Sequence, residues 1–468
     1  MSKVETLQKE LLYNQENGYK DLNNKEQKEI FAFSEDYKAF LNACKTEREC
    51  VDYTLEQAEK AGFKPLSSFE TLKKGDKVYV NNRGKAILLA VMGEKPASMG
   101  VRMVAAHIDA PRLDLKPNPL FENTEVAYLK THYYGGIKKY QWTTIPLALH
   151  GVVIKKNGET VKISIGEKAD DPVFTISDLL PHLAASQMKG DATKIIEGEK
   201  LNVILGTMPF ASEENIKDAV KLNVMKLLND AYGIVEKDFI SAEIEVVPAF
   251  PARDVGLDRS LVGAYGHDDR VCAYTALRAI LDASASEKTN ICYLVDKEEI
   301  GSSDNTGMRS RFFEDVLAEL CAKTEGGYSD LLVRRALTNS ACLSSDVTAA
   351  LDPSFDSVME RNNSAYLNKG VAFMKYTGAR GKSGTSDCSC EFFREVTDIM
   401  DNNGVVWQTG ELGRVDEGGG GTVAQYVAML NVNVIDCGVP LFSMHSPFEL
   451  ASKFDIYQAY KAYKAFYK

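Results

Sequence analysis

The stretch NICYLVDKEEIGS, residues 290–302, combines two patterns that decide the fold. It begins with a short apolar run that is typical of a buried strand, and four charged residues follow that run directly. The segments RMVAAHIDA (102–110) and ALTNSACLSSDV (336–347) repeat the arrangement, because each is a strand-like run that leads to histidine or aspartate. Acidic and histidine side chains therefore gather at the ends of predicted strands.

Predicted helices and strands alternate after residue 253. The segment DDRVCAYTALRAILDA (268–283) has apolar residues at helical spacing, and GMRSRFFEDVLAELC (307–321) and CEFFREVTDIM (390–400) are also predicted helices. Strand-like segments such as GVAFMKY and NVNVID lie between them. This alternation predicts an α/β fold with a mixed central sheet and helices on both faces. In open α/β sheets, ligands bind at the carboxyl ends of the strands, so we expect the functional site there.

The length of the chain predicts more than one domain. A chain of 468 residues exceeds the size at which a single core usually stops growing. From about residue 121 to 250, strand-rich segments and an Asn157-Gly158 turn precede a predicted helix and a further strand. We therefore predict a catalytic domain made of residues 1–120 and 251–468, with a β-rich domain over 121–250 inserted into it.

Bulk composition narrows the classes of partner and compartment. The net charge of −11 argues against nucleic acid as a partner. No run of eighteen apolar residues exists, so no membrane span is expected, and the polar N-terminus has no signal-like segment. The nine cysteines are odd in number and scattered. These features together predict a cytoplasmic protein.

Five short stretches carry the candidate site residues. They are AAHIDAP with His107 and Asp109, YGHDDRV with Asp268, LVDKEEIGS with Glu298 and Glu299, LSSDVTA with Asp346, and FSMHSPF with His445. Read singly, each has a plain alternative: a loop pair, a helix N-terminal Asp-Asp pair, a solvated charge or a buried structural histidine. Read together, two imidazoles and several carboxylates predict a site for two divalent metals. One carboxylate of the Glu-Glu pair would bind metal while the other takes a proton from water, and Asp109 would orient His107.

The order and spacing of these stretches resemble the dinuclear-zinc aminopeptidases, and most closely the aspartyl aminopeptidase family. The matching motifs are HIDAP, GHDD, DKEEIGS, SSD and MHSPFE. The resemblance covers nearly the whole chain, including the segment inserted between the first histidine and Asp268. The segments DAPRLDLKPNPL and THYYGGIKKYQW are similar to a bacterial branch of the family.

The resemblance implies a role for each candidate ligand. Asp268 would bridge two zinc ions. His107 and Asp346 would complete one site, and Glu299 and His445 would complete the other. Nitrogen and oxygen ligands without thiolate suit zinc, and they also suit cobalt or manganese.

The resemblance also implies the reaction and its partners. Glu298 would be the general base for hydrolysis of the N-terminal residue of a peptide, with a preference for Asp or Glu there. His150 would reach the active site of a neighbouring subunit, and Lys375, or Lys369 in its place, would contact the acidic side chain of the substrate. The family assembles into homo-oligomers built from dimers, so a dodecamer with the inserted domain as dimer contact or lid is one expected assembly.

Three alternatives remain open from the sequence. A carboxypeptidase or deacylase uses a similar ligand order, but it needs a cation for the carboxylate of its substrate, and Arg270, Arg361 or Arg380 would have to supply it. A scaffold without catalysis would not need intact ligands at every position. A phosphohydrolase usually carries more histidine ligands than the two in these motifs.

Overall fold

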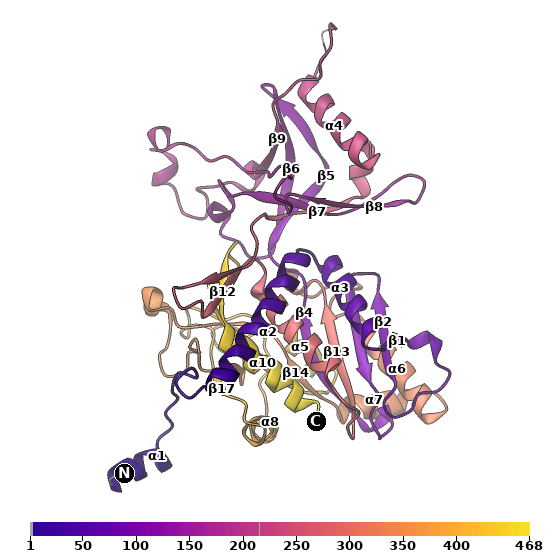
Figure 1. The fold of residues 1–468 in the computed structure, drawn as a ribbon, viewed down its shortest axis with the longest axis vertical. Coiled ribbons are helices and arrows are strands. Elements are labelled where there is room, and N and C mark those ends of the chain that lie inside the picture. The colour runs from indigo at the N-terminus through magenta and orange to yellow at the C-terminus, as the bar shows by residue number, and fades with distance from the viewer. Residues whose placement is uncertain (1–2, 215) are drawn as a thin grey trace.

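The computed structural model describes residues 3–214 and 216–468 and builds them around a nine-stranded sheet (Figure 1). In spatial order its strands are β1 (Lys64–Pro65), β2 (Lys77–Asn82), β3 (Ala86–Val91), β13 (Thr289–Val295), β4 (Val101–His107), β14 (Ala341–Ser344), β18 (Asn433–Gly438), β16 (Val371–Met374) and β17 (Trp407–Thr409). Strand β4 runs parallel to both β13 and β14, whereas β3 and β16 are antiparallel to their neighbours β13 and β18. The sheet is therefore mixed, with a parallel centre.

Helices cover both faces of this sheet. One face packs against α2 (Asn24–Ala43), α3 (Glu47–Lys60), α5 (His267–Leu281), α8 (Cys390–Asn402) and α10 (Lys453–Phe466), and the other against α6 (Phe312–Glu325), α7 (Asp330–Thr338) and α9 (Ala424–Met429). Side chains of β4 alternate between the two cores, with Val104 and Ala106 on the first face and Met103 and Ala105 on the second. The predicted α/β fold is confirmed. Within the described residues, no helix combines the length and apolarity that crossing a bilayer requires.

A second sheet, with six strands, stands at one end of the molecule (Figure 1). Its spatial order is β8 (Thr160–Ile165), β7 (Leu147–Ile154), β10 (Glu243–Pro248), β5 (Arg112–Asn123), β6 (Val126–Tyr134) and β9 (Asn202–Gly206). The chain leaves the central sheet after β4 and returns to it after β10. The division into a catalytic domain and a β-rich insertion over residues 121–250 stays a prediction, and β5 begins at Arg112, before the predicted lower limit.

Two smaller features complete the fold. A five-stranded sheet of β11 (Arg253–Val255), β12 (Leu261–Ala264), β20 (Glu449–Ser452), β19 (Pro440–Phe442) and β15 (Thr348–Ala349) lies between the two larger sheets (Figure 1). Helix α1 (Lys3–Leu11) lies apart from the rest of the chain (Figure 1).

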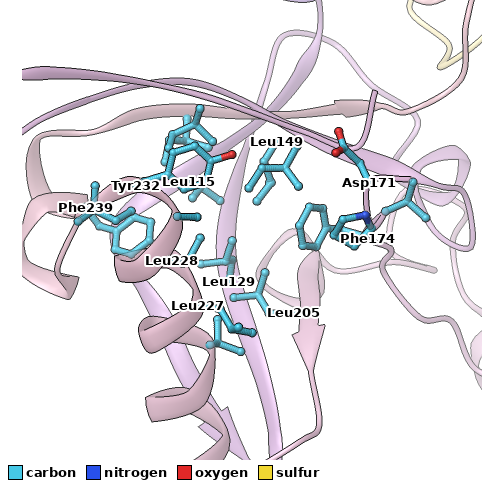
Figure 2. A pocket seen from close by; sticks show the side chains of 18 residues that line it. Leu115, Leu129, Leu149, Asp171, Phe174, Leu205, Leu227, Leu228, Tyr232 and Phe239 are labelled. Carbon is cyan, nitrogen blue, oxygen red and sulfur yellow. The ribbon is translucent and has the colours of Figure 1, made fainter. Parts of the chain in front are cut away.

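The second sheet has its own apolar core and a cavity beside it. Helix α4 (Ala219–Tyr232) packs on the sheet, and an apolar cavity of about 450 Å³ lies between them. Figure 2 shows Leu227 and Leu228 of α4 projecting into the same space as Leu129 and Leu205 of the sheet. No candidate site residue is part of the lining of this cavity.

Candidate active site

The ends of three neighbouring strands bring most of the candidate ligands together. Strand β4 ends at His107, β13 leads into a short 3-10 turn at Glu298–Ile300, and β14 ends two residues before Asp346. Because β13, β4 and β14 are adjacent and parallel, their carboxyl ends lie at one edge of the sheet. Residues far apart in the sequence are therefore held at a single point by backbone pairing.

Asp268 and His445 reach this point from outside the central sheet. Asp268 lies in the first turn of α5, and His445 lies in the loop between β19 and β20. Asp268 Oδ1 is 3.2 Å from His107 Nε2, and its Oδ2 is 3.1 Å from His445 Nε2. Each oxygen of one carboxylate thus faces a different imidazole, which is the arrangement expected of a carboxylate that bridges two cations.

The remaining carboxylates surround this pair of imidazoles. Glu299 Oε2 is 3.5 Å from His445 Nε2, and Glu298 Oε2 and Asp346 Oδ1 are each 3.9 Å from His107 Nε2. Two overlapping groups have their potential ligand atoms within 4.8 Å of one another: His107, Glu298 and Asp346, and His107, Asp268 and Glu299. The structure therefore brings all of the predicted ligands together, and it places Glu298 as near to His107 as Asp346 is.

Burial makes this cluster of acids unfavourable without a cation. It raises the pKa of Glu298 to about 7, and it raises the pKa of Glu299 and of Asp346 well above their usual range. Glu299 Oε1 is buried and has no hydrogen-bond partner among the described residues. The oxygen and nitrogen donors and the unpartnered oxygen of Glu299 fit divalent zinc. Bound zinc would neutralise the negative charge of the carboxylates and would give Glu299 Oε1 a partner.

Asp109 contacts the candidate ligand His107. It is fully buried, its Oδ1 is 3.2 Å from His107 Nδ1, and its carboxylate accepts the backbone N–H groups of Glu298 (3.1 Å) and Glu299 (3.2 Å). The backbone carbonyl of Asp109 also accepts from His107 Nδ1 (3.0 Å), so both the carbonyl and the carboxylate of Asp109 orient this imidazole, while the carboxylate also holds the Glu-Glu turn in place.

The sequence analysis missed Glu449, which has a similar position on the other side. Glu449 is 1% exposed, and it accepts the backbone N–H of Asp268 (3.0 Å) and that of His445 (2.7 Å). It thus fixes two ligand-bearing loops relative to each other. The available signal was an acidic residue within a strand-like apolar segment, only four residues after His445.

His150 has contacts that suit a structural residue. It lies on β7 and is 2% exposed, and its Nδ1 and Nε2 are 2.8 Å from Glu49 Oε1 and 3.0 Å from Glu167 Oε1. Both ring nitrogens are therefore engaged within the chain. The predicted role of His150 in a neighbouring subunit stays a prediction, and the described contacts do not support it.

The candidate substrate-binding cations lie beyond the metal-ligand cluster. Lys375 follows β16 and is exposed, whereas Lys369 is half-buried with its ammonium 4.6 Å from the ring centre of Tyr366. Arg270 is fully buried, and Arg361 pairs with a surface aspartate. Burial therefore keeps Arg270 from receiving a substrate carboxylate, as a carboxypeptidase would require.

A cavity of about 600 Å³ opens beside His445. Its lining combines Lys138 and Tyr140, from the loop after β6, with Asp352 and Phe355, from the central part of the fold. Of the candidate ligands, His445 is the one that lines this cavity.

Comparison with known proteins gives the family. Residues 40–467 match the model of the aminopeptidase I zinc metalloprotease family, M18. The chain belongs to the M18 family. It is therefore a hydrolase, a zinc metalloaminopeptidase, which confirms the family and the reaction class predicted from the five motifs and sets aside the carboxypeptidase, phosphohydrolase and scaffold alternatives.

M18 relatives match over the full length of the chain. A probable M18 family aminopeptidase 1 of Clostridium acetobutylicum is 51% identical over 461 residues, which is 98% of this chain and 99% of the relative. The crystal structure of an M18 aminopeptidase from Thermotoga maritima superposes with a TM-score of 0.94 at 46% identity and covers 97% of this chain and 99% of that one. The S. cerevisiae mApe1 dodecamer structure shares the fold, with a TM-score of 0.75 at 20% identity over 93% of this chain and 96% of its own.

Proposed function

We propose that this M18 aminopeptidase holds two zinc ions per chain and uses Glu298 as its general base. The proposed ligands are His107, Asp268, Glu299, Asp346 and His445. The observation that carries the proposal is the position of Asp268, whose two carboxylate oxygens lie 3.2 Å and 3.1 Å from two different imidazoles. Two bound zinc ions would supply a nucleophilic water at neutral pH and would polarise the scissile carbonyl.

The residues around the zinc site have distinct tasks in this proposal. Asp109 keeps the His107 ring oriented and holds the backbone of Glu298, so that its carboxylate faces the ligand cluster. The Glu298 carboxylate, which faces the ligand cluster without being one of the proposed ligands, would accept a proton from water and return it to the departing amine. The cavity beside His445 would hold the peptide beyond the scissile bond.

Zinc stoichiometry and a matched set of peptides test the assignment. The protein, stripped with a chelator and titrated with zinc, should bind two ions per chain and regain activity, and cobalt or manganese should also restore turnover. Peptides with a free N-terminus should be cleaved, whereas the same peptides after N-acetylation should not. Full activity with one ion per chain would refute the two-metal site, and cleavage of only the acetylated peptides would refute the proposed use of the site.

We also propose that the chains assemble into a homo-oligomer built from dimers. Large apolar side chains are exposed in the inserted segment, among them Leu179, Leu180, Leu183, Met188, Met208 and Leu227. Apolar surface of this kind favours burial against another copy. The mApe1 dodecamer gives a specific size to test by light scattering, and a monomer at micromolar concentration would contradict the proposal.

A further inference from the structure

A short segment at the end of β6, Tyr134–Gly136, contacts the zinc site from the second sheet. Tyr134 is the last residue of β6 and is 7% exposed, and Gly135 and Gly136 continue the chain toward the central sheet. All three residues lie outside the proposed ligand set. Each of them nevertheless meets a different ligand or ligand-orienting residue of the site.

Tyr134 is hydrogen-bonded to the carboxylate that orients the first imidazole. Its hydroxyl donates to Asp109 Oδ2 over 2.8 Å, and the contact is buried. The same oxygen accepts the N–H of Glu299, while the other oxygen of Asp109 lies 3.2 Å from His107 Nδ1. The tyrosine hydroxyl is therefore part of the network that sets the direction of the Asp109 carboxylate and so of the His107 ring.

The ring of Tyr134 is itself held firmly. The guanidinium of Arg112 lies 3.9 Å from its ring centre, and the two residues are directly paired between β5 and β6. Arg112 is 3% exposed and bonds to Asp114 (2.8 Å) and Glu245 (3.2 Å) of the second sheet, while its Nη1 is 3.6 Å from Glu47 of α3. This buried arginine fastens the tyrosine between the two parts of the fold.

The two glycines meet the other half of the zinc site. Gly136 O is 2.8 Å from His445 Nδ1, so the protonated Nδ1 donates to this carbonyl and Nε2 faces Asp268 and Glu299. At Gly135, where φ is +76°, a Cβ atom would lie 3.1 Å from Glu299 Oε2. The backbone thus passes so close to Glu299 that a side chain at residue 135 would displace it.

We propose that Tyr134–Gly136 is a positioning element for the zinc site, which fixes His107 through Asp109 and fixes His445 directly. The segment does not bind zinc, and it orients the imidazoles that do. The inference rests on the proposed zinc site. In this proposal the second sheet helps to orient the imidazoles of its own chain, in addition to any contact that it makes between subunits.

The first test compares Tyr134→Phe with Tyr133→Phe, a variant of the neighbouring tyrosine, which is 41% exposed. Zinc affinity is measured by competition with a chromophoric chelator, and kcat and KM are measured with zinc in excess. Tyr134→Phe should weaken zinc affinity and lower kcat by about tenfold or more, the usual effect of losing a residue that orients a ligand. KM should stay unchanged because the hydroxyl faces Asp109 and not the substrate. Tyr133→Phe should match the wild type in all three quantities.

The second test uses a backbone position. Gly135→Ala should weaken zinc affinity because its methyl group presses on Glu299, whereas Gly158→Ala should not, since Gly158 has a similar φ of +84° but no atom within 4 Å of the added Cβ. Circular dichroism of the zinc-free proteins should be the same for all variants. The effect of Tyr134→Phe should also largely disappear in an Asp109→Asn background, because the two residues act through one hydrogen bond.

The outcomes separate this inference from the proposed function. Wild-type protein that binds no zinc would overturn the zinc site itself. Wild-type protein that binds two ions, together with Tyr134→Phe and Gly135→Ala variants of unchanged zinc affinity, would overturn the positioning role alone. A zinc-free variant that unfolds would indicate a structural role and would also count against the proposal.

Discussion

Replacing His150 with glutamine is expected to destabilise the protein in a way that depends on pH. Burial opposes protonation of this imidazole, but its hydrogen bonds to Glu167 and Glu49 outweigh burial and raise its pKa from 6.5 to about 9. An imidazole with a raised pKa stabilises the fold fully below the unfolded value of 6.5, and this contribution is lost as pH rises through about 9. At 1.36 kcal/mol for each tenfold change in proton affinity, the rise of this pKa from 6.5 to about 9 contributes about 3 kcal/mol.

The assay is urea unfolding followed by tryptophan fluorescence, to which both Trp142, fully buried in the second sheet's core, and the partly buried Trp407 contribute. At about pH 6, His150→Gln should lower the free energy of unfolding by about 3 kcal/mol relative to the wild type, and at about pH 10 the difference should be close to zero. His132→Gln, which alters an exposed histidine of the same sheet, is the matched control. An equal loss at both pH values would refute the ionic explanation. A variant of wild-type stability with no activity would instead support the catalytic role across subunits that the motif resemblance implies.

Three further predictions concern the active site. Glu298→Gln should retain two zinc ions while kcat falls by about 10²–10⁴, because it removes the general base and leaves the proposed ligands intact; near-wild-type kcat would show that another group takes the proton. Glu449→Gln should weaken zinc affinity about tenfold in a chelator competition, since Glu449 holds two ligand-bearing loops through backbone N–H groups, and an unchanged affinity would contradict that function. We propose that Lys375 gives the enzyme a preference for an N-terminal Glu over Leu, measured as the ratio of the two kcat/KM values. Lys375→Met should then lower this ratio by about tenfold or more and Lys369→Met should leave it unchanged, whereas the reverse result would make Lys369 the substrate-binding cation.

The central sheet was predictable because its strands are short apolar runs that end in charged residues. The segment 336–347 shows the limit of that reasoning. It was predicted as one strand, but α7 extends to Thr338 and β14 covers only Ala341–Ser344. A short apolar run fits a buried strand and the end of a helix equally well, so its boundary is set by tertiary packing.

The candidate ligands could be predicted from the sequence, whereas the residues that orient them through backbone contacts could not. A metal site needs particular side chains, and those side chains leave a motif at each strand end. Glu449 acts on backbone N–H groups, and Gly136 acts through its own backbone carbonyl. Neither contact requires a recognisable motif, since any chain that passes the same point can supply a carbonyl. Only the three-dimensional path of the chain reveals such contacts.

The position of the insertion explains why those contacts exist. The chain leaves the central sheet just after His107 and re-enters it only at β13, beyond Asp268, yet these two side chains end 3.2 Å apart. A flexible linker of the same length would close this gap at a modest entropic cost, because closure entropy grows only slowly with loop length. A linker would, however, provide neither the Tyr134 hydroxyl for Asp109 nor the Gly136 carbonyl for His445. The second sheet would therefore contribute to the proposed zinc site through specific contacts at its root, and not merely by connecting two candidate ligands.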